Sequence, residues 1–204
     1  MPEEKIEQFN LIISGTGGQG LITLLGILNH AAFAEGYDVK SSELHGLSQR
    51  GGSVDVHMRF GKKINSPLVK TGGANLIISL EAQEALREAQ FASKEAGTVF
   101  LINNFIVPIP GAPALPIADI EQALSKNAEK VIIIPASAIC QKEVGNGATA
   151  GVYLVLWAAF KRLIPLDPQN ILDAVKKEIN PKYLDVNLKA FELVEKNAEE
   201  NNFI

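Results

Sequence analysis

The chain is poor in cysteine and histidine, the side chains on which many metal and redox centres depend. Its 204 residues include one cysteine, Cys140, and three histidines. A single thiol can form no disulfide within the chain and cannot supply the four thiolates of an iron–sulfur cluster. His30, His45 and His57 lack the close spacing of a metal-binding motif. We therefore expect no iron–sulfur cluster or metal on this chain alone.

Long apolar runs are also missing. Residues 21–28 and 152–160 are the strongest candidates, and both fall short of the roughly 18 apolar residues that a membrane-spanning helix needs. The first five residues, MPEEK, are polar and acidic, unlike a secretory signal peptide. These features favour a cytoplasmic protein with no membrane partner.

Positive charge is scarce. Lysine and arginine total 19 against 23 acidic residues, which gives a net charge of −4 and disfavours a nucleic-acid partner. Residues 40–70 are the exception, with six basic side chains against two acidic ones. Such a region fits a small anionic ligand or an acidic partner surface. The alternative is a solvent-exposed sheet edge whose lysines prevent pairing with other strands, and the sequence leaves both interpretations open.

The composition is otherwise that of an ordinary globular protein, with 47% hydrophobic and 21% charged residues. A chain of this length can bury a sizeable core without disulfides. No stretch is poor enough in apolar residues to act as a linker, so residues 1–204 are predicted to form a single domain.

Short apolar runs alternate with helical stretches along the chain, which predicts an α/β fold. We expect a three-layer α/β/α arrangement with a Rossmann-like, mostly parallel sheet and a helical C-terminal part. The expected strands are residues 9–14, 38–42, 53–60, 75–80, 98–103 and 131–135, and the expected helices are 18–35, 81–90, 119–126, 148–163, 168–179 and 181–201.

Three segments carry more specific predictions. Residues 53–60 alternate apolar and polar side chains, and a turn at 61–63 would return the chain as a partner strand at 64–69, making the sheet mixed. Four prolines within 105–118 favour an extended excursion on the surface. The helix at 148–163 is apolar on every side, so we expect it to be buried against the sheet or against a partner subunit.

A glycine loop, GTGGQG, follows the first predicted strand and precedes the first helix. Gly15, Gly17 and Gly20 match the pattern G-x-G-x-x-G in the context that it requires. Glycines let the backbone approach a phosphate, which the unpaired amides at the helix start can bind. Gly18 adds backbone access, and Gln19 adds a side-chain amide. A tight turn without a ligand is the alternative.

A second motif, SELHGLSQRGGSV, spans residues 42–54. Glu43 stands where a dinucleotide-binding domain has the acidic residue that binds the ribose hydroxyls. Arg50 lies among glycines, and its planar guanidinium suits a phosphate or a carboxylate. His45 could act as an acid or base, or simply hydrogen-bond its own loop. His57 and Cys140 are expected to be structural, as is His30.

The two motifs together resemble the gamma-type domain of 2-oxoacid:ferredoxin oxidoreductases. The resemblance rests on residues 15–20 (GTGGQG), 42–46 (SELHG) and 49–54 (QRGGSV). The form Glu-x-His-Gly-x-x-Gln-Arg-Gly-Gly is closest to the beta subunits of indolepyruvate ferredoxin oxidoreductases. The rest of the chain is similar in length and element order.

The resemblance implies the small subunit of a complex that oxidatively decarboxylates a 2-oxoacid, with indolepyruvate or an aryl pyruvate as substrate, to an acyl-coenzyme A. A larger alpha-type partner would bind thiamine diphosphate, carry the iron–sulfur clusters and pass electrons to ferredoxin. This chain would supply part of the coenzyme A site and no catalytic residue. The candidate cofactor-binding residues are Gly15, Gly17, Gly18, Gln19, Gly20, Glu43, Gln49, Arg50 and Ser53.

Two other interpretations stay open. The chain could be a free-standing Rossmann-type enzyme that uses Glu43 to bind NAD(P) or a flavin. It could also be a structural subunit whose glycines serve turns only. Copurification with a thiamine-dependent partner distinguishes the first from a subunit, and coenzyme A binding by the assembled complex distinguishes the second.

Overall fold

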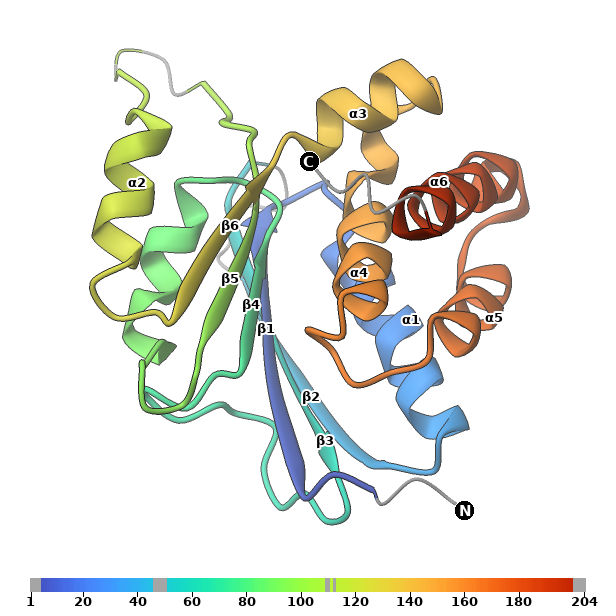
Figure 1. The fold of residues 1–204 in the computed structure, drawn as a ribbon, viewed down its shortest axis with the longest axis horizontal. Helices are drawn as coiled ribbons and strands as arrows, with labels where there is room; N and C mark the ends of the chain where they lie inside the picture. The colour runs from blue at the N-terminus through green and yellow to red at the C-terminus, as the bar shows by residue number, and fades with distance from the viewer. Residues whose placement is uncertain (1–4, 46–50, 109–110, 112, 200–204) are drawn as a thin grey trace.

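The computed structural model describes residues 5–45, 51–108, 111 and 113–199. A six-stranded sheet runs through the middle of the molecule in the order β2-β3-β1-β4-β5-β6 (Figure 1). Strands β1, β4, β5 and β6 are mutually parallel, whereas β3 is antiparallel to both of its neighbours, β1 and β2. The strands are β1 (Gln8–Thr16), β2 (Asp38–His45), β3 (Ser53–Gly61), β4 (Leu76–Ser79), β5 (Val99–Asn103) and β6 (Lys130–Ile134).

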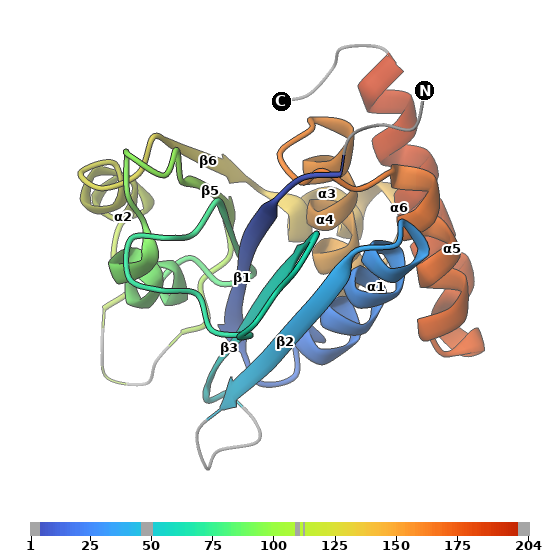
Figure 2. The same cartoon turned by 90° about the horizontal axis from the view of Figure 1, so that it is seen from below.

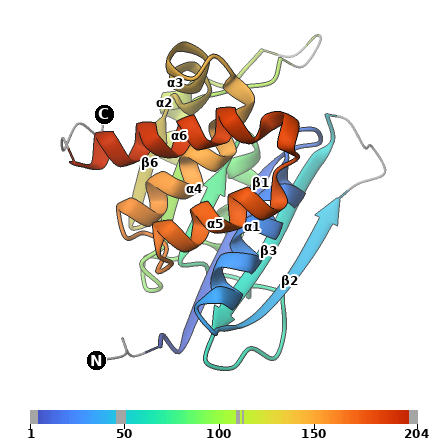
Figure 3. The same cartoon turned by 90° about the vertical axis from the view of Figure 1, so that its right-hand side faces the viewer.

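Helices cover both faces of this sheet, which confirms the predicted three layers. One face carries α1, α4, α5 and α6, and these stand in front of the sheet in Figure 3. The other face carries α2 and the 3-10 helix η1, as Figures 1 and 2 show. Their bounds are α1 (Leu21–Ala34), η1 (Glu84–Phe91), α2 (Ile117–Leu124), α3 (Ala136–Glu143), η2 (Gly147–Thr149), α4 (Ala150–Phe160), α5 (Pro168–Glu178) and α6 (Pro181–Glu199).

The predicted partner strand at 64–69 was wrong, although the predicted mixed sheet was right. Strand β3 pairs with β2, which precedes it, and with β1 on its other side. With both edges of β3 occupied, no edge is left for a third strand. Two amides of this segment instead meet side chains of β2 and β3: Ile64 N donates to Asp38 at 2.8 Å and Val69 N donates to His57 at 3.1 Å.

Helix α4 forms the centre of the larger hydrophobic core. Every residue from Ala150 to Ala159 is buried, because α1, α3, α5, α6 and strand β5 all pack around it. This chain therefore covers the apolar helix itself. Cys140, on α3, is also fully buried in this core, which confirms its predicted structural place. Among the described helices, none combines the length and apolar character needed to cross a membrane.

Candidate functional site

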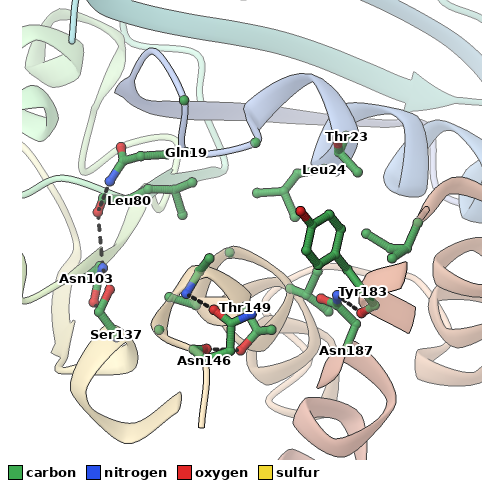
Figure 4. Close-up of a pocket in the computed structure, with 18 of the residues that line it drawn as sticks. Gln19, Thr23, Leu24, Leu80, Asn103, Ser137, Asn146, Thr149, Tyr183 and Asn187 are labelled. Atoms are coloured by element: carbon green, nitrogen blue, oxygen red, sulfur yellow. Dashed lines mark hydrogen bonds between the residues drawn. The ribbon is translucent and has the colours of Figure 1, made fainter. Parts of the chain in front are cut away.

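A cavity of about 970 Å³ opens where the parallel strands end. Strand β1 leads to α1 on one face, and β4 leads to η1 on the other face. In open α/β sheets, ligands bind outside the carboxyl ends of strands at such a reversal. The cavity is lined by the glycine loop, the ends of β4 and β5, the start of α4 and the junction of α5 with α6 (Figure 4).

Two glycines of the loop, Gly18 and Gly20, line this cavity. Gly18 and Gly20 have φ angles of 102° and 81°, in the left-handed region that favours glycine. Within the described part of the chain, neither amide has a hydrogen-bond acceptor. Gly20 also caps the start of α1 without a side-chain hydrogen bond. The start of α1, where the helix dipole is positive, therefore borders the cavity beside two glycines whose amides bond to no described residue, an arrangement suited to an anion.

The Gln19 side chain holds the loop in place. Its Oε1 accepts from Thr16 N at 2.7 Å, and its Nε2 donates to the Leu80 carbonyl at 3.2 Å. A β-carbon on Gly15 would lie 2.5 Å from that Oε1, so the bridge requires glycine there. Gln19 thus shapes the cavity through its own hydrogen bonds rather than by offering a free amide.

The floor of the cavity continues this chain of hydrogen bonds across the strand ends. Asn103 Nδ2 donates to the same Leu80 carbonyl at 3.1 Å and to Ser137 Oγ at 2.8 Å. Asn103 Oδ1 accepts the amide of Ser137 at 3.1 Å. Figure 4 shows these residues in line beneath Gln19. Because Ser137 Oγ accepts from Asn103, its own proton is free to be donated to a ligand.

The far wall is built around the start of α4. Asn146 accepts the amide of Ala148 at 3.0 Å and so caps the short helix that leads into α4. Beyond it, the Tyr183 ring points toward Leu24 and Thr23 across the cavity in Figure 4. The cavity therefore has polar groups beside the loop and an aromatic and aliphatic surface opposite. This pairing suits a ligand with a charged head and a less polar tail.

Three of the nine predicted cofactor-binding residues line the cavity: Gly18, Gln19 and Gly20. Gly15 and Gly17 lie behind this surface, where Gly17 exchanges backbone hydrogen bonds with residues 51–52. Gln49 and Arg50 lie outside the described residues.

Glu43 and Ser53 point elsewhere. Glu43 is exposed on β2, and β3 separates that strand from β1, so the carboxylate is a full strand further from the loop than a ribose-binding acid. Ser53 Oγ donates to Glu84 on η1, across the opposite face of the sheet. The insertion of β3 explains both placements, and it weakens the dinucleotide interpretation.

The other singled-out residues have partners within the chain. His30 Nδ1 lies 2.7 Å from Glu178 on α5 and links the two helices. His57 is buried on β3 and accepts the Val69 amide. The side chain of His45 lies outside what the structure describes. In the basic region, Lys40 pairs with Asp38 and Lys62 with Glu7, as expected of solvated lysines near a sheet edge.

Sequence reasoning missed the floor and the far wall of the cavity. Asn103 follows the apolar run of β5, and Asn146 stands three residues before Thr149, where a helix cap is expected. Both positions could have been marked as strand-end or cap residues. Their meeting with Gly18 depends on tertiary packing, which no local pattern indicates.

The Gln19 bridge leads to a first prediction. Gln19→Met keeps the length of the side chain but leaves the Thr16 amide without its acceptor. We expect the free energy of unfolding to fall by about 1–2 kcal/mol, the usual cost of an unsatisfied partly buried donor. Urea denaturation measures this. Gln90→Met, at an exposed position on η1, is the matched control; equal losses in both variants would refute the bridge.

A family model and individual relatives agree on the family of this chain. The family model described as "Pyruvate ferredoxin/flavodoxin oxidoreductase" matches residues 10–195. The chain is 33% identical to indolepyruvate oxidoreductase subunit IorB of Archaeoglobus fulgidus, over 91% of this chain and 93% of that protein. It is 34% identical to the subunit of the same name from Thermococcus kodakarensis, over 96% and 98%.

Solved structures share the fold. Pyruvate oxidoreductase subunit PORC from Thermotoga maritima has a TM-score of 0.68 at 14% identity, covering 93% of this chain and 96% of its own. The 2-oxoglutarate:ferredoxin oxidoreductase from Magnetococcus marinus has a TM-score of 0.66 at 18% identity, covering 97% of this chain and 32% of its own. The latter structure contains 2-oxoglutarate, coenzyme A and succinyl-CoA. Sequence and fold together place this chain in the pyruvate ferredoxin/flavodoxin oxidoreductase family.

Proposed function

We propose that this chain is the small subunit of a 2-oxoacid:ferredoxin oxidoreductase that acts on indolepyruvate or a related aryl 2-oxoacid. In the overall reaction, the 2-oxoacid and coenzyme A yield an acyl-coenzyme A and carbon dioxide, and two electrons pass to ferredoxin. The substrate assignment rests on the relatives named indolepyruvate oxidoreductase subunits.

The role of this chain in the proposed reaction is to form one wall of the coenzyme A site. The observation that carries this proposal is the cavity lined by Gly18 and Gly20, whose amides bond to no described residue. These donors and the α1 dipole suit a phosphate group. The surface of Leu24 and Tyr183 suits the less polar pantetheine arm. Arg50 and Gln49, from the second motif, remain proposed ligands of the same phosphates.

The chemical steps belong to a partner in this proposal. A single buried cysteine cannot hold an iron–sulfur cluster, so we assign the clusters and thiamine diphosphate to a larger alpha-type subunit. Phe105 and Tyr183 line the cavity and are also exposed to solvent, 39% and 49% respectively. Exposed apolar side chains at the rim of a site suit contact with another subunit.

The isolated chain is therefore expected to oxidise no 2-oxoacid. It lacks the groups that stabilise an acyl carbanion and accept its electrons. The assay supplies indolepyruvate, thiamine diphosphate, coenzyme A and an artificial electron acceptor to the purified chain, and then to the chain coexpressed with a large thiamine-dependent subunit. Activity in the coexpressed pair alone agrees with the proposal. Turnover by the rigorously purified single chain contradicts it.

A further inference from the structure

Three ionisable side chains meet on the face of the sheet opposite the cavity. Asp55 and His57 alternate with core residues along β3 and so point toward η1, which contributes Glu88. One nitrogen or oxygen from each residue lies within 4.8 Å of the others. His57 is 1% exposed and Glu88 is 4% exposed, while Asp55 is half-buried.

Two atoms of this cluster lack partners. Within the described residues, neither His57 Nε2 nor Glu88 Oε2 forms a hydrogen bond, although both are buried. The nearest carboxylate oxygen to Nε2 is Asp55 Oδ2, at 3.5 Å. A buried polar atom without a partner is costly, so a cluster with two of them calls for an explanation.

The Val69 amide decides which nitrogen of His57 carries the proton. It donates to Nδ1 at 3.1 Å, so Nδ1 must offer a lone pair and the single proton of a neutral ring is on Nε2. A second proton on Nδ1 would face the Val69 N–H directly. In this orientation His57 points its Nε2 atom, and not its Nδ1 lone pair, toward the two carboxylates.

We propose that Asp55, His57 and Glu88 form a proton-dependent latch, in which a proton held between the two carboxylates keeps η1 seated on β3. With that proton, one carboxyl is neutral and can donate, while the Nε2–H faces the other. Without it, the carboxylates of buried Glu88 and half-buried Asp55 repel each other.

The charges around Glu88 support a proton-dependent latch. Burial, and then the negative charge of Asp55, raise the pKa of Glu88 from 4.5 to about 7. Arg87 opposes this rise and Glu84 adds slightly to it, and those two side chains pair with each other, 3.6 Å apart. The charged or titratable groups around Glu88 are thus Asp55 and His57 from β3 and Glu84 and Arg87 from its own helix. From the segment before β4, Val69 contributes its amide to His57 Nδ1.

The sign of the pH dependence follows from the raised pKa. Between pH 4.5 and 7 the folded chain holds a proton on Glu88 that the unfolded chain releases. The latch therefore contributes its full stability below that window. Its contribution is lost as the pH rises through the folded value.

The same three residue types also occur at metal sites, so a divalent cation is the competing occupant. Coordination by Nε2 would need its proton removed while Nδ1 still faces the Val69 amide. That leaves the ring without a proton, an anionic form that a neutral-pH site does not favour. The orientation of His57 thus favours a proton over a metal.

The start of β3 connects the latch to the glycine loop. Ser53, two residues before Asp55, donates to Glu84, and Gly17 N donates to the Gly52 carbonyl at 2.8 Å. Strand β3 is thereby tied to η1 on one side and to the glycine loop on the other. Loss of the latch proton would loosen the support behind the loop.

Hydrogen exchange of the full chain tests the latch. We expect the opening equilibrium of the η1 amides, corrected for intrinsic exchange, to rise about 30-fold between pH 5.5 and pH 8 in the native sequence, given the two pKa values. Glu88→Gln imitates the protonated carboxyl and should abolish most of this rise. Glu95→Gln, at an exposed position after η1, should keep it. An equal rise in Glu88→Gln overturns the proposal.

Two further measurements cover the other outcomes. If Glu88→Gln fails to fold, a carbon-13 titration of the Glu88 carboxyl in the native chain replaces it. A midpoint near pH 7 supports the latch, and a shift that stays constant from pH 5.5 to 8 overturns it. Zinc chloride added to the metal-free native chain should leave the melting temperature unchanged. A zinc-dependent increase that Glu88→Gln removes would identify a metal site instead.

Discussion

Replacing Gly18 with valine is expected to weaken coenzyme A binding by the assembled complex roughly ten- to a hundredfold. The Gly18 φ of 102° is strained for a β-branched side chain, so the loop must turn its amide away from the cavity. Losing a hydrogen bond to a charged group costs about 1.5–3 kcal/mol, which corresponds to this range of affinities. Isothermal titration of the complex with coenzyme A measures the loss.

Gly97→Val is the matched control for this change. Gly97 also has a positive φ, of 65°, and open space around its β-carbon position, but it lies in the turn before β5, at the other end of the strands. Both variants should lose similar stability, and only Gly18→Val should lose affinity. If a folded and assembled Gly18→Val complex binds coenzyme A as tightly as the Gly97→Val complex, the loop does not hold the phosphates.

Shortening Leu156 to alanine is expected to lower the free energy of unfolding by about 2–5 kcal/mol. The side chain is fully buried at the centre of α4, and neighbours on several elements cannot all collapse into the space that it leaves. Guanidinium denaturation followed by the fluorescence of Trp157, on the same helix, measures the change.

Leu68→Ala removes the same atoms from a position that is 49% exposed. It should change stability by less than about 1 kcal/mol, because surface substitutions rarely cost more. Comparable losses at the two positions would contradict the description of α4 as the central core helix. A large loss at Leu156 alone would agree with a helix covered by this chain without a partner subunit.

The central strands β1, β4 and β5 could be predicted from the sequence because they are buried on both faces. Runs such as LIIS in β4 and VFLIN in β5 read as uninterrupted apolar segments, and their ends agree with the structure to within one or two residues. The helix predicted at 81–90 begins later, at Glu84, and is a 3-10 helix. The Glu81 carboxylate accepts the Glu84 amide at 2.8 Å and holds the first residues outside the helix.

Strand pairing could not be predicted in the same way. The alternation in β3 shows that it is a strand with two different faces, but says nothing of its neighbours. Residues 64–69 were predicted as its partner because they follow β3 directly in the chain. The structure uses β2 and β1, because a strand inserted between them buries both of its edges.

The candidate site also has a part that local sequence predicts and a part that depends on tertiary packing. The glycine loop could be recognised because its function depends on local backbone conformation at Gly18 and Gly20. The polar floor and the far wall could not, because Asn103, Ser137 and Tyr183 come together only through the packing of distant elements. The ribose-binding alternative for Glu43 depends in the same way on which strand lies beside β1, which no local pattern indicates.

The two walls of the cavity come from opposite ends of the chain, with Gly18 in the loop before α1 and Asn187 within α6. A ligand that touches both binds only molecules in which every element between them has folded. By mass action, such a ligand at a hundred times its dissociation constant would add about 2.7 kcal/mol to the stability of the whole chain. The amount of that ligand bound at saturation would then measure how many molecules in a preparation are correctly folded.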